Sequence, residues 1–251
     1  MKQLANYCSG QAHKGISEMA TNLWKESGER VSGLMEKYPD YKLVVTGHSL
    51  GGGTSCLLTV QLYVNEVFKD RTVECFAFAP PPTFWPCEDT RAVPSSCPDK
   101  IQKAMENTVA YIHDNDVVPF LCVGAVRRFA KLLSAVDSRT QKIWFWNREK
   151  IFHGFTPIPE DITESVLTAE KLAEKNETVE GECPMIIPAH RVIWMKEISE
   201  GRFEAFGCDP FKVARGNIFL CPDMLLDHLP EQYENALDAL LENENAVDAS
   251  K

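Results

Sequence analysis

The stretch Leu43-Val-Val-Thr-Gly-His-Ser-Leu-Gly-Gly-Gly-Thr54 decides the fold class of this 251-residue chain. It begins as a short apolar strand, passes through Gly47-His48-Ser49-Leu50-Gly51, which fits the pattern G-x-S-x-G, and continues into a helix expected to end near residue 69. A strand, a sharp turn and a helix in that order are the context that this nucleophile turn requires. The pattern predicts Ser49 above the end of a strand, with glycines that let neighbouring backbones pass closely. It also directs the backbone N–H of Leu50 toward an oxyanion. The residues single out no second oxyanion donor.

Apolar strands alternate with amphipathic helices on either side of this turn. The expected strands are 42–46, 73–79 and 108–113, and the expected helices are 11–38, 51–69, 100–106 and 123–136. Residues 83–100 look like a loop rich in proline and cysteine. Such alternation predicts an α/β fold, with a mostly parallel sheet and helices on both of its faces.

The second half of the chain departs from this alternation. Residues 141–188 form an insertion that resembles a lid, with eight acidic and two basic side chains between residues 160 and 182. A hairpin, 190–196 with 202–206, and a last helix, 223–242, follow it, and the acidic tail 243–251 ends the chain. A length of 251 residues is typical of one domain, and we expect a single domain over 1–251.

Composition and charge exclude several classes of function. The net charge of −10 and the pI near 5.2 make nucleic-acid binding a poor fit. The nine cysteines contain no CxxC pair, so no metal site is expected, and reduced, buried thiols are the simplest interpretation. Cys87 and Cys97 are the pair suited to a disulfide if the compartment is oxidising. The sequence shows neither a signal peptide nor an apolar run of about 18 residues, which predicts a cytoplasmic protein.

A serine nucleophile needs a base, and four histidines follow Ser49. The base of this fold is expected in a loop after a late strand and before a closing helix, and His228 lies past the hairpin 190–206. His113 ends a strand that supplies the acid, His153 lies in the insertion, and His190 begins a strand.

Two carboxylates compete for the role of the acid. Asp114 and Asp116 both follow the strand 108–113. Asp116 precedes an apolar Val-Val-Pro segment that can pack it against the sheet, whereas Asp114 is placed to cap the turn. Both are also ordinary turn residues, so the spacing alone leaves the choice open.

Four segments together resemble the class 3 (fungal-type) lipases, and among them the sn-1-specific diacylglycerol lipases most. They are Leu43–Thr54, Cys75–Pro82, Asp116–Pro119 and Asp227–Pro230, and His13-Lys-Gly15 resembles a further element of the family. The resemblance implies an α/β-hydrolase fold with Ser49 as nucleophile, Asp116 as acid and His228 as base. It also implies a regulatory insertion between the acid and the base. The family carries an N-terminal strand and an oxyanion loop before the His-x-Gly element, and nothing in the twelve residues before His13 resembles them.

We therefore expect hydrolysis of acylglycerol esters through an acyl-enzyme, with no metal or organic cofactor. A remnant of the lipase fold that binds lipid or a protein without turnover is the alternative, because the residues before His13 do not resemble the family's N-terminal strand and oxyanion loop. An esterase for soluble esters is a third hypothesis, against which an apolar groove beside Ser49 would argue.

Residues 127–150 carry seven basic and two acidic side chains in an otherwise acidic chain, and Trp144-Phe145-Trp146 lies among them. Basic and aromatic side chains favour an anionic membrane surface, so residues 139–152 are a candidate for peripheral membrane contact. The acidic segment 160–182 would restrain this contact in the free protein. The alternative is that the aromatic side chains form a buried face and the charges a solvated one.

Overall fold

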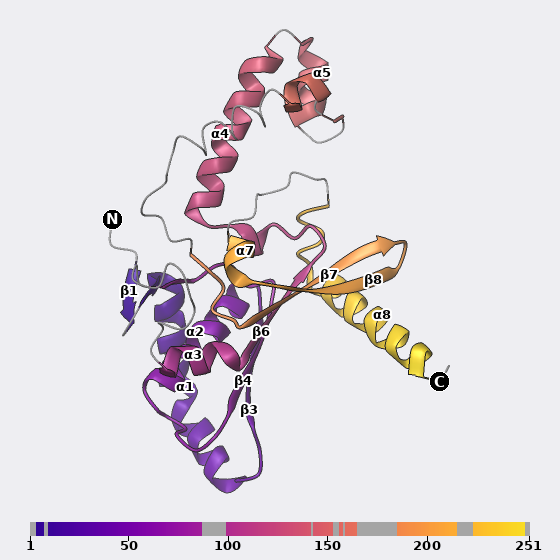
Figure 1. Cartoon of the computed structure of the whole chain (residues 1–251). Coiled ribbons are helices and arrows are strands. Elements are labelled where there is room, and N and C mark those ends of the chain that lie inside the picture. The colour runs from indigo at the N-terminus through magenta and orange to yellow at the C-terminus, as the bar shows by residue number, and fades with distance from the viewer. Residues whose placement is uncertain are drawn as a thin grey trace.

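A computed structural model describes residues 4–7, 10–86, 99–141, 143–152, 156–157, 159–164, 185–214 and 223–248 (Figure 1). The expected pair Cys87–Cys97, most of the acidic segment 160–182 and the end of the tail 243–251 lie outside these residues. The strands are β1 Leu4–Tyr7, β2 Gly10–His13, β3 Leu43–His48, β4 Val73–Phe78, β5 Phe84–Pro86, β6 Thr108–His113, β7 Arg191–Ser199 and β8 Arg202–Cys208. The helices are α1 Lys14–Lys37, α2 Leu50–Val64, α3 Asp99–Glu106, the 3-10 helix η3 Val118–Phe120, α4 Val123–Thr140, α5 Phe145–Phe152, α7 Pro210–Ala214 and α8 Pro230–Asp248.

The central sheet is mostly parallel, as the alternation of strands and helices predicts. Its order within the described residues is β3-β4-β6-β7-β8, in which only β8 runs antiparallel to its neighbour. Four parallel strands, β3, β4, β6 and β7, therefore end at one edge of the sheet. Ser49 follows β3 and Asp116 follows β6, so the topology brings both residues to that edge.

Helices cover both faces of this sheet (Figure 1). On one face, α1, α2 and α3 bury a core that includes Leu57, Val60 and Ile101. On the other face, α8 packs Tyr233 and Ala236 against β4, β6 and β7. In β4 the buried side chains alternate with half-buried ones, so adjacent residues enter different cores.

Three short strands were not predicted from the sequence. β1, β2 and β5 form a separate antiparallel sheet in the order β1-β2-β5. The expected loop over 83–100 is wrong at its start, because Phe84 is fully buried and β5 pairs with β2. Prolines surround and end this strand, and proline is a signal against a strand.

The last helix also begins later than expected. Residues 223–229 form turns, and α8 starts at Pro230. Proline has no N–H to lose and a backbone angle suited to the first helical position, so it starts the helix there. His228 consequently lies in a turn rather than within a helix.

Candidate active site

Ser49 occupies a strained turn between β3 and α2. Its backbone angles are φ 57° and ψ −125°, a region that non-glycine residues rarely adopt and that marks functional sites. The Ser49 N–H donates to the carbonyl of Phe78 in β4 at 2.9 Å, which holds the turn against the neighbouring strand. The N–H of Leu50 lies in the first turn of α2, where helical N–H groups have no partner within the helix.

The glycines around Ser49 are not equivalent. A Cβ on Gly47 would collide with the backbone of Gly51, and one on Gly52 would lie 2.8 Å from the carbonyl oxygen of Phe78. A Cβ on Gly51 would meet nothing within 4 Å. The expectation that both flanking glycines of G-x-S-x-G serve close packing is therefore wrong for Gly51, whereas Gly52 does serve it.

Asp116 lies fully buried just after β6. One carboxylate oxygen, Oδ1, accepts the N–H of Val118 at 2.9 Å, and the other, Oδ2, accepts the hydroxyl of Tyr233 at 2.6 Å. Both oxygens lie 3.0 Å from Nδ1 of His228. A buried carboxylate with this many donors is held in one orientation.

His228 completes a continuous chain of hydrogen bonds. Its Nε2 lies 2.8 Å from the Oγ of Ser49, while its Nδ1 faces Asp116. With the proton on Nδ1, the imidazole donates to Asp116 and its Nε2 accepts the hydroxyl proton of Ser49. Three residues predicted separately from the sequence thus lie in direct contact, although 112 residues separate Asp116 from His228.

The competing candidates lie elsewhere. Asp114 faces Lys196, with its Oδ1 3.3 Å from the ammonium nitrogen, and makes no contact with His228 among the interactions described. His113 is buried at the end of β6, and its Nδ1 lies 3.7 Å from Asp227. His190 is exposed just before β7, and His153 lies outside the described residues.

Two aromatic residues, one beside the acid and one beside the base, were not predicted from the sequence. The hydroxyl of Tyr233 accepts the backbone N–H of His113 at 3.0 Å while donating to Asp116, so it ties the acid to the end of β6. Burial, together with the negative Asp116, raises the pKa of Tyr233 well above its usual value, so the phenol keeps its proton. A tyrosine in an expected helix is most often a core residue, which is why it gave no signal.

The second neighbour is His48, whose ring packs on that of His228 with 4.8 Å between their centroids. Burial, and after it the nearby His228, lower the pKa of His48, which favours the neutral imidazole. A neutral ring in this position adds no charge that would repel a proton on His228.

His13 has a structural role. Its Nδ1 accepts the N–H of Ile16 at 3.3 Å and caps the start of α1. The segment His13-Lys-Gly15, which resembles an element of the family, therefore forms the start of a helix. No group of three or more potential metal ligands is found within the part of the chain that the structure describes.

Residues 1–124 match the family model described as Lipase (class 3). This part of the chain is therefore similar to the class 3 lipases. The match confirms the resemblance inferred from the motifs, and it includes Ser49 and Asp116 but ends before His228. The mostly parallel sheet covered by helices confirms the α/β-hydrolase fold expected for such a lipase.

Relatives of known name extend this similarity over most of the chain. Diacylglycerol lipase-beta of Mus musculus is 27% identical over 270 residues, which cover 94% of this chain and 38% of the mouse protein. Diacylglycerol lipase-alpha of Homo sapiens is 25% identical over 82% of this chain and 20% of its own. The chain thus spans well under half the length of these relatives. A lipase structure from Rhizomucor miehei, determined with its propeptide, aligns over 90% of this chain and 51% of its own, at 16% identity and a TM-score of 0.47.

Proposed function

We propose that this chain hydrolyses ester bonds of acylglycerols, with Ser49 as nucleophile, His228 as base and Asp116 as the acid that orients the base. The hydrogen-bonded chain from Ser49 Oγ through His228 to Asp116 carries the proposal. His228 Nε2 takes the proton of Ser49 while Oγ attacks the ester carbonyl carbon. Asp116 stabilises the imidazolium that forms, and the Leu50 N–H donates to the oxyanion.

The second half of the reaction follows from the same contacts. His228 returns its proton to the leaving alcohol, which departs as the acyl group stays on Ser49. Water then enters, gives its proton to His228, attacks the acyl carbonyl and releases the fatty acid. Each step uses only the side chains in contact here and needs no cofactor.

Exposed leucines beside the three residues favour a lipid over a soluble ester. They flank the nucleophile, the acid and the base in sequence, and they are Leu50 47%, Leu121 43%, Leu225 64%, Leu226 55% and Leu229 43% exposed. Contiguous exposed apolar side chains mark sites that contact lipid or another apolar surface, and these leucines lie near the three residues in the sequence. We accordingly propose an acylglycerol with long acyl chains as substrate, and a diacylglycerol in particular because of the similarity to diacylglycerol lipases.

The membrane is the natural source of this substrate. The structure has no helix long and apolar enough to cross a bilayer among the residues it describes. We propose that the chain meets its substrate by peripheral contact through residues 139–152.

The test is covalent labelling combined with turnover. A fluorophosphonate probe is expected to label the wild-type protein and the control Ser27→Ala, but not Ser49→Ala. The Ser27 side chain is half-buried on α1, where its hydroxyl donates to the carbonyl of Leu23. Release of fatty acid from diacylglycerol should follow the same pattern and exceed release from a soluble short-chain ester. Labelling that survives Ser49→Ala removes Ser49 from the mechanism. An unlabelled protein that still binds diacylglycerol vesicles supports the remnant without turnover, and faster cleavage of the soluble ester supports the esterase.

A further inference from the structure

The helices α4 and α5 form an arm, residues Val123–Phe152, that leaves the edge of the sheet carrying the active site. The arm follows β6 and η3, so it begins just beyond Asp116. Figure 1 shows α4 running away from the sheet beyond the carboxyl end of β6, with α5 at its far end. The arm therefore extends on the side of the molecule where Ser49 and the exposed leucines lie.

Three aromatic side chains are exposed at the far end of this arm. Trp144 is 71% exposed, Phe145 57% and Trp146 65%. Phe145 and Trp146 pack edge to face against each other, with 5.4 Å between ring centroids. The interpretation of these residues as a buried face is therefore wrong. Large apolar side chains exposed side by side usually mark a contact surface.

The arm is packed without these aromatic side chains. Val136 on α4 and Ile162 are buried together, and Leu132 and Ile143 pack against them. Ile151 turns inward from α5 and is 8% exposed. Smaller aliphatic residues therefore fill the interior of the arm. The arm is packed although its aromatic residues are exposed.

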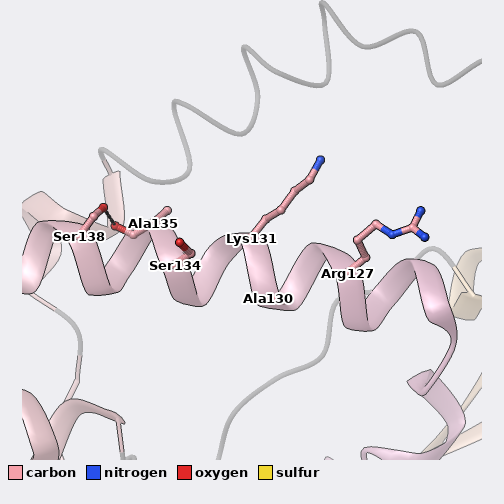
Figure 2. Close-up of a pocket in the computed structure, with 6 residues that line it drawn as sticks. All are labelled: Arg127, Ala130, Lys131, Ser134, Ala135 and Ser138. Atoms are coloured by element: carbon pink, nitrogen blue, oxygen red, sulfur yellow. Dashed lines mark hydrogen bonds between the residues drawn. The ribbon is translucent and has the colours of Figure 1, made fainter.

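One face of α4 adds positive charge. Arg127, Lys131, Ser134 and Ser138 recur at spacings of four and three residues, which place them on one side of a helix. Figure 2 shows Arg127 and Lys131 extending from the same side of α4, where this face lines an open hollow of about 540 Å³. Residues 127–150 have a net charge of +5 in a chain of −10.

We propose that the arm docks the protein on an anionic lipid bilayer, with Trp144, Phe145 and Trp146 inserted at the headgroup level. Aromatic rings suit this interface, and each basic side chain near an anionic surface strengthens binding roughly fivefold. Docking turns the carboxyl edge of the parallel strands, and with it Ser49, toward the membrane. The inference rests on the proposed function only in explaining why the arm and the active site share an edge.

Charge complementarity decides between the bilayer and a second copy of this chain. Two copies that met through their arms would bring two segments of net charge +5 together, and like charges in a contact weaken it. An anionic bilayer offers opposite charge and an apolar layer beneath it. The arm matches both properties.

Co-sedimentation with vesicles tests the proposal. The full chain carrying Ser49→Ala is mixed with vesicles of phosphatidylcholine alone or of phosphatidylcholine with phosphatidylserine, so that binding is measured without turnover. We expect binding to the anionic vesicles and little to the neutral ones. Binding should weaken when NaCl rises from about 0.1 M to about 1 M, because the screening length falls from about 10 Å to about 3 Å.

Two double variants locate the contact. Trp144→Ala with Trp146→Ala should lower binding at least about tenfold, since these rings lose their burial in the interface. Tyr38→Ala with Tyr41→Ala is the matched control and should change binding less than twofold. Tyr41 is 69% exposed, and both tyrosines precede β3 and so lie at the opposite edge of the sheet. Lys131→Glu should weaken binding more than tenfold, because it reverses a charge.

Several outcomes overturn the proposal. Equal binding to neutral and anionic vesicles, absence of binding, or an unchanged Trp144→Ala, Trp146→Ala variant each do so. A dimer in sedimentation velocity that this variant abolishes assigns the arm to a second copy instead. Turnover of a soluble short-chain ester, measured on the chain with Ser49 intact, reports the proposed function separately. It should be unaffected by the tryptophan variant, whose circular dichroism verifies folding.

Discussion

Two histidine–aspartate pairs lie near Tyr233, and among the described residues one of them contacts a nucleophile. In the pair His228–Asp116, Nδ1 faces the carboxylate at 3.0 Å and Nε2 meets Ser49 at 2.8 Å. In the pair His113–Asp227, the shortest separation is 3.7 Å, and neither ring nitrogen of His113 finds a hydrogen-bond partner among the described residues. The rings of His48 and His113 each lie 5.6 Å from that of Tyr233.

The difference between the pairs lies in geometry and access rather than in residue type. The side chain of His228 is 21% exposed, whereas that of His113 is 5% exposed. A base must reach both a proton and the substrate, and burial under β8 and α8 denies this to His113, whose ring packs near Phe203. We therefore expect the first pair to govern turnover and the second to govern packing, and four predictions test this division.

The largest difference is expected between variants in which one or the other histidine is replaced. His228→Ala should lower kcat by about 10⁶-fold, since a missing base disables the nucleophile. His113→Phe keeps an aromatic ring of similar volume and removes two buried nitrogens without partners, so kcat should change less than about tenfold. Fatty-acid release from diacylglycerol measures both. A larger loss in the His113 variant, with folding intact, would make it the base.

The carboxylates give the next largest effect. Asp116→Asn should lower kcat by about 10⁴-fold, because the amide favours the wrong tautomer of His228. Asp227→Asn and Asp114→Asn should each stay within about tenfold of the wild type, since neither carboxylate is described in contact with His228. All three variants are measured by fatty-acid release from diacylglycerol. The reverse ranking would contradict the assignment of the acid.

Tyr233→Phe should have a smaller effect on both turnover and stability. It removes the 2.6 Å hydrogen bond to Asp116 and leaves the buried N–H of His113 without its acceptor. We expect kcat to fall by about 10- to 100-fold, as for a lost hydrogen bond to a charged group, and the free energy of unfolding to fall by about 1–3 kcal/mol. Steady-state kinetics and urea denaturation measure the two effects. An unchanged kcat would show that Val118 and His228 alone hold Asp116.

The smallest effect concerns pH and the second pair. Burial raises the pKa of Asp227, against the lowering effects of the Asn115 N–H and His113. The folded protein therefore holds this proton more tightly than the unfolded chain, and stability falls as pH rises from the unfolded pKa through the raised folded one. Asp227→Asn should remove this fall while still accepting the N–H of Asn115.

Urea denaturation at acidic and at neutral pH measures this effect. The variant should gain stability relative to the wild type between about pH 4, near the pKa of an unfolded aspartate, and neutral pH. A relative loss over the same interval would mean that the pair His113–Asp227 stabilises the ionised carboxylate.

The sequence was sufficient for the features that arise from neighbouring residues. The strand, turn and helix around Ser49 follow from apolar residues before a glycine-rich turn, and the parallel order of β3, β4 and β6 follows from the helices between them. Because parallel strands end at the same edge of a sheet, this order is enough to predict that Ser49 and Asp116 lie at one edge. The strands β1, β2 and β5 gave no signal, because runs of three or four residues show too little periodicity.

Only the tertiary structure decided which distant groups meet. Nothing near His228 in sequence shows that a turn before α8 brings its imidazole between Ser49 and Asp116, or that Tyr233 packs behind the acid. The exposure of Trp144, Phe145 and Trp146 was likewise decided by packing, because Ile and Val side chains filled the interior of the arm. Periodicity reports which face of an element is apolar, but the folded chain determines what covers that face.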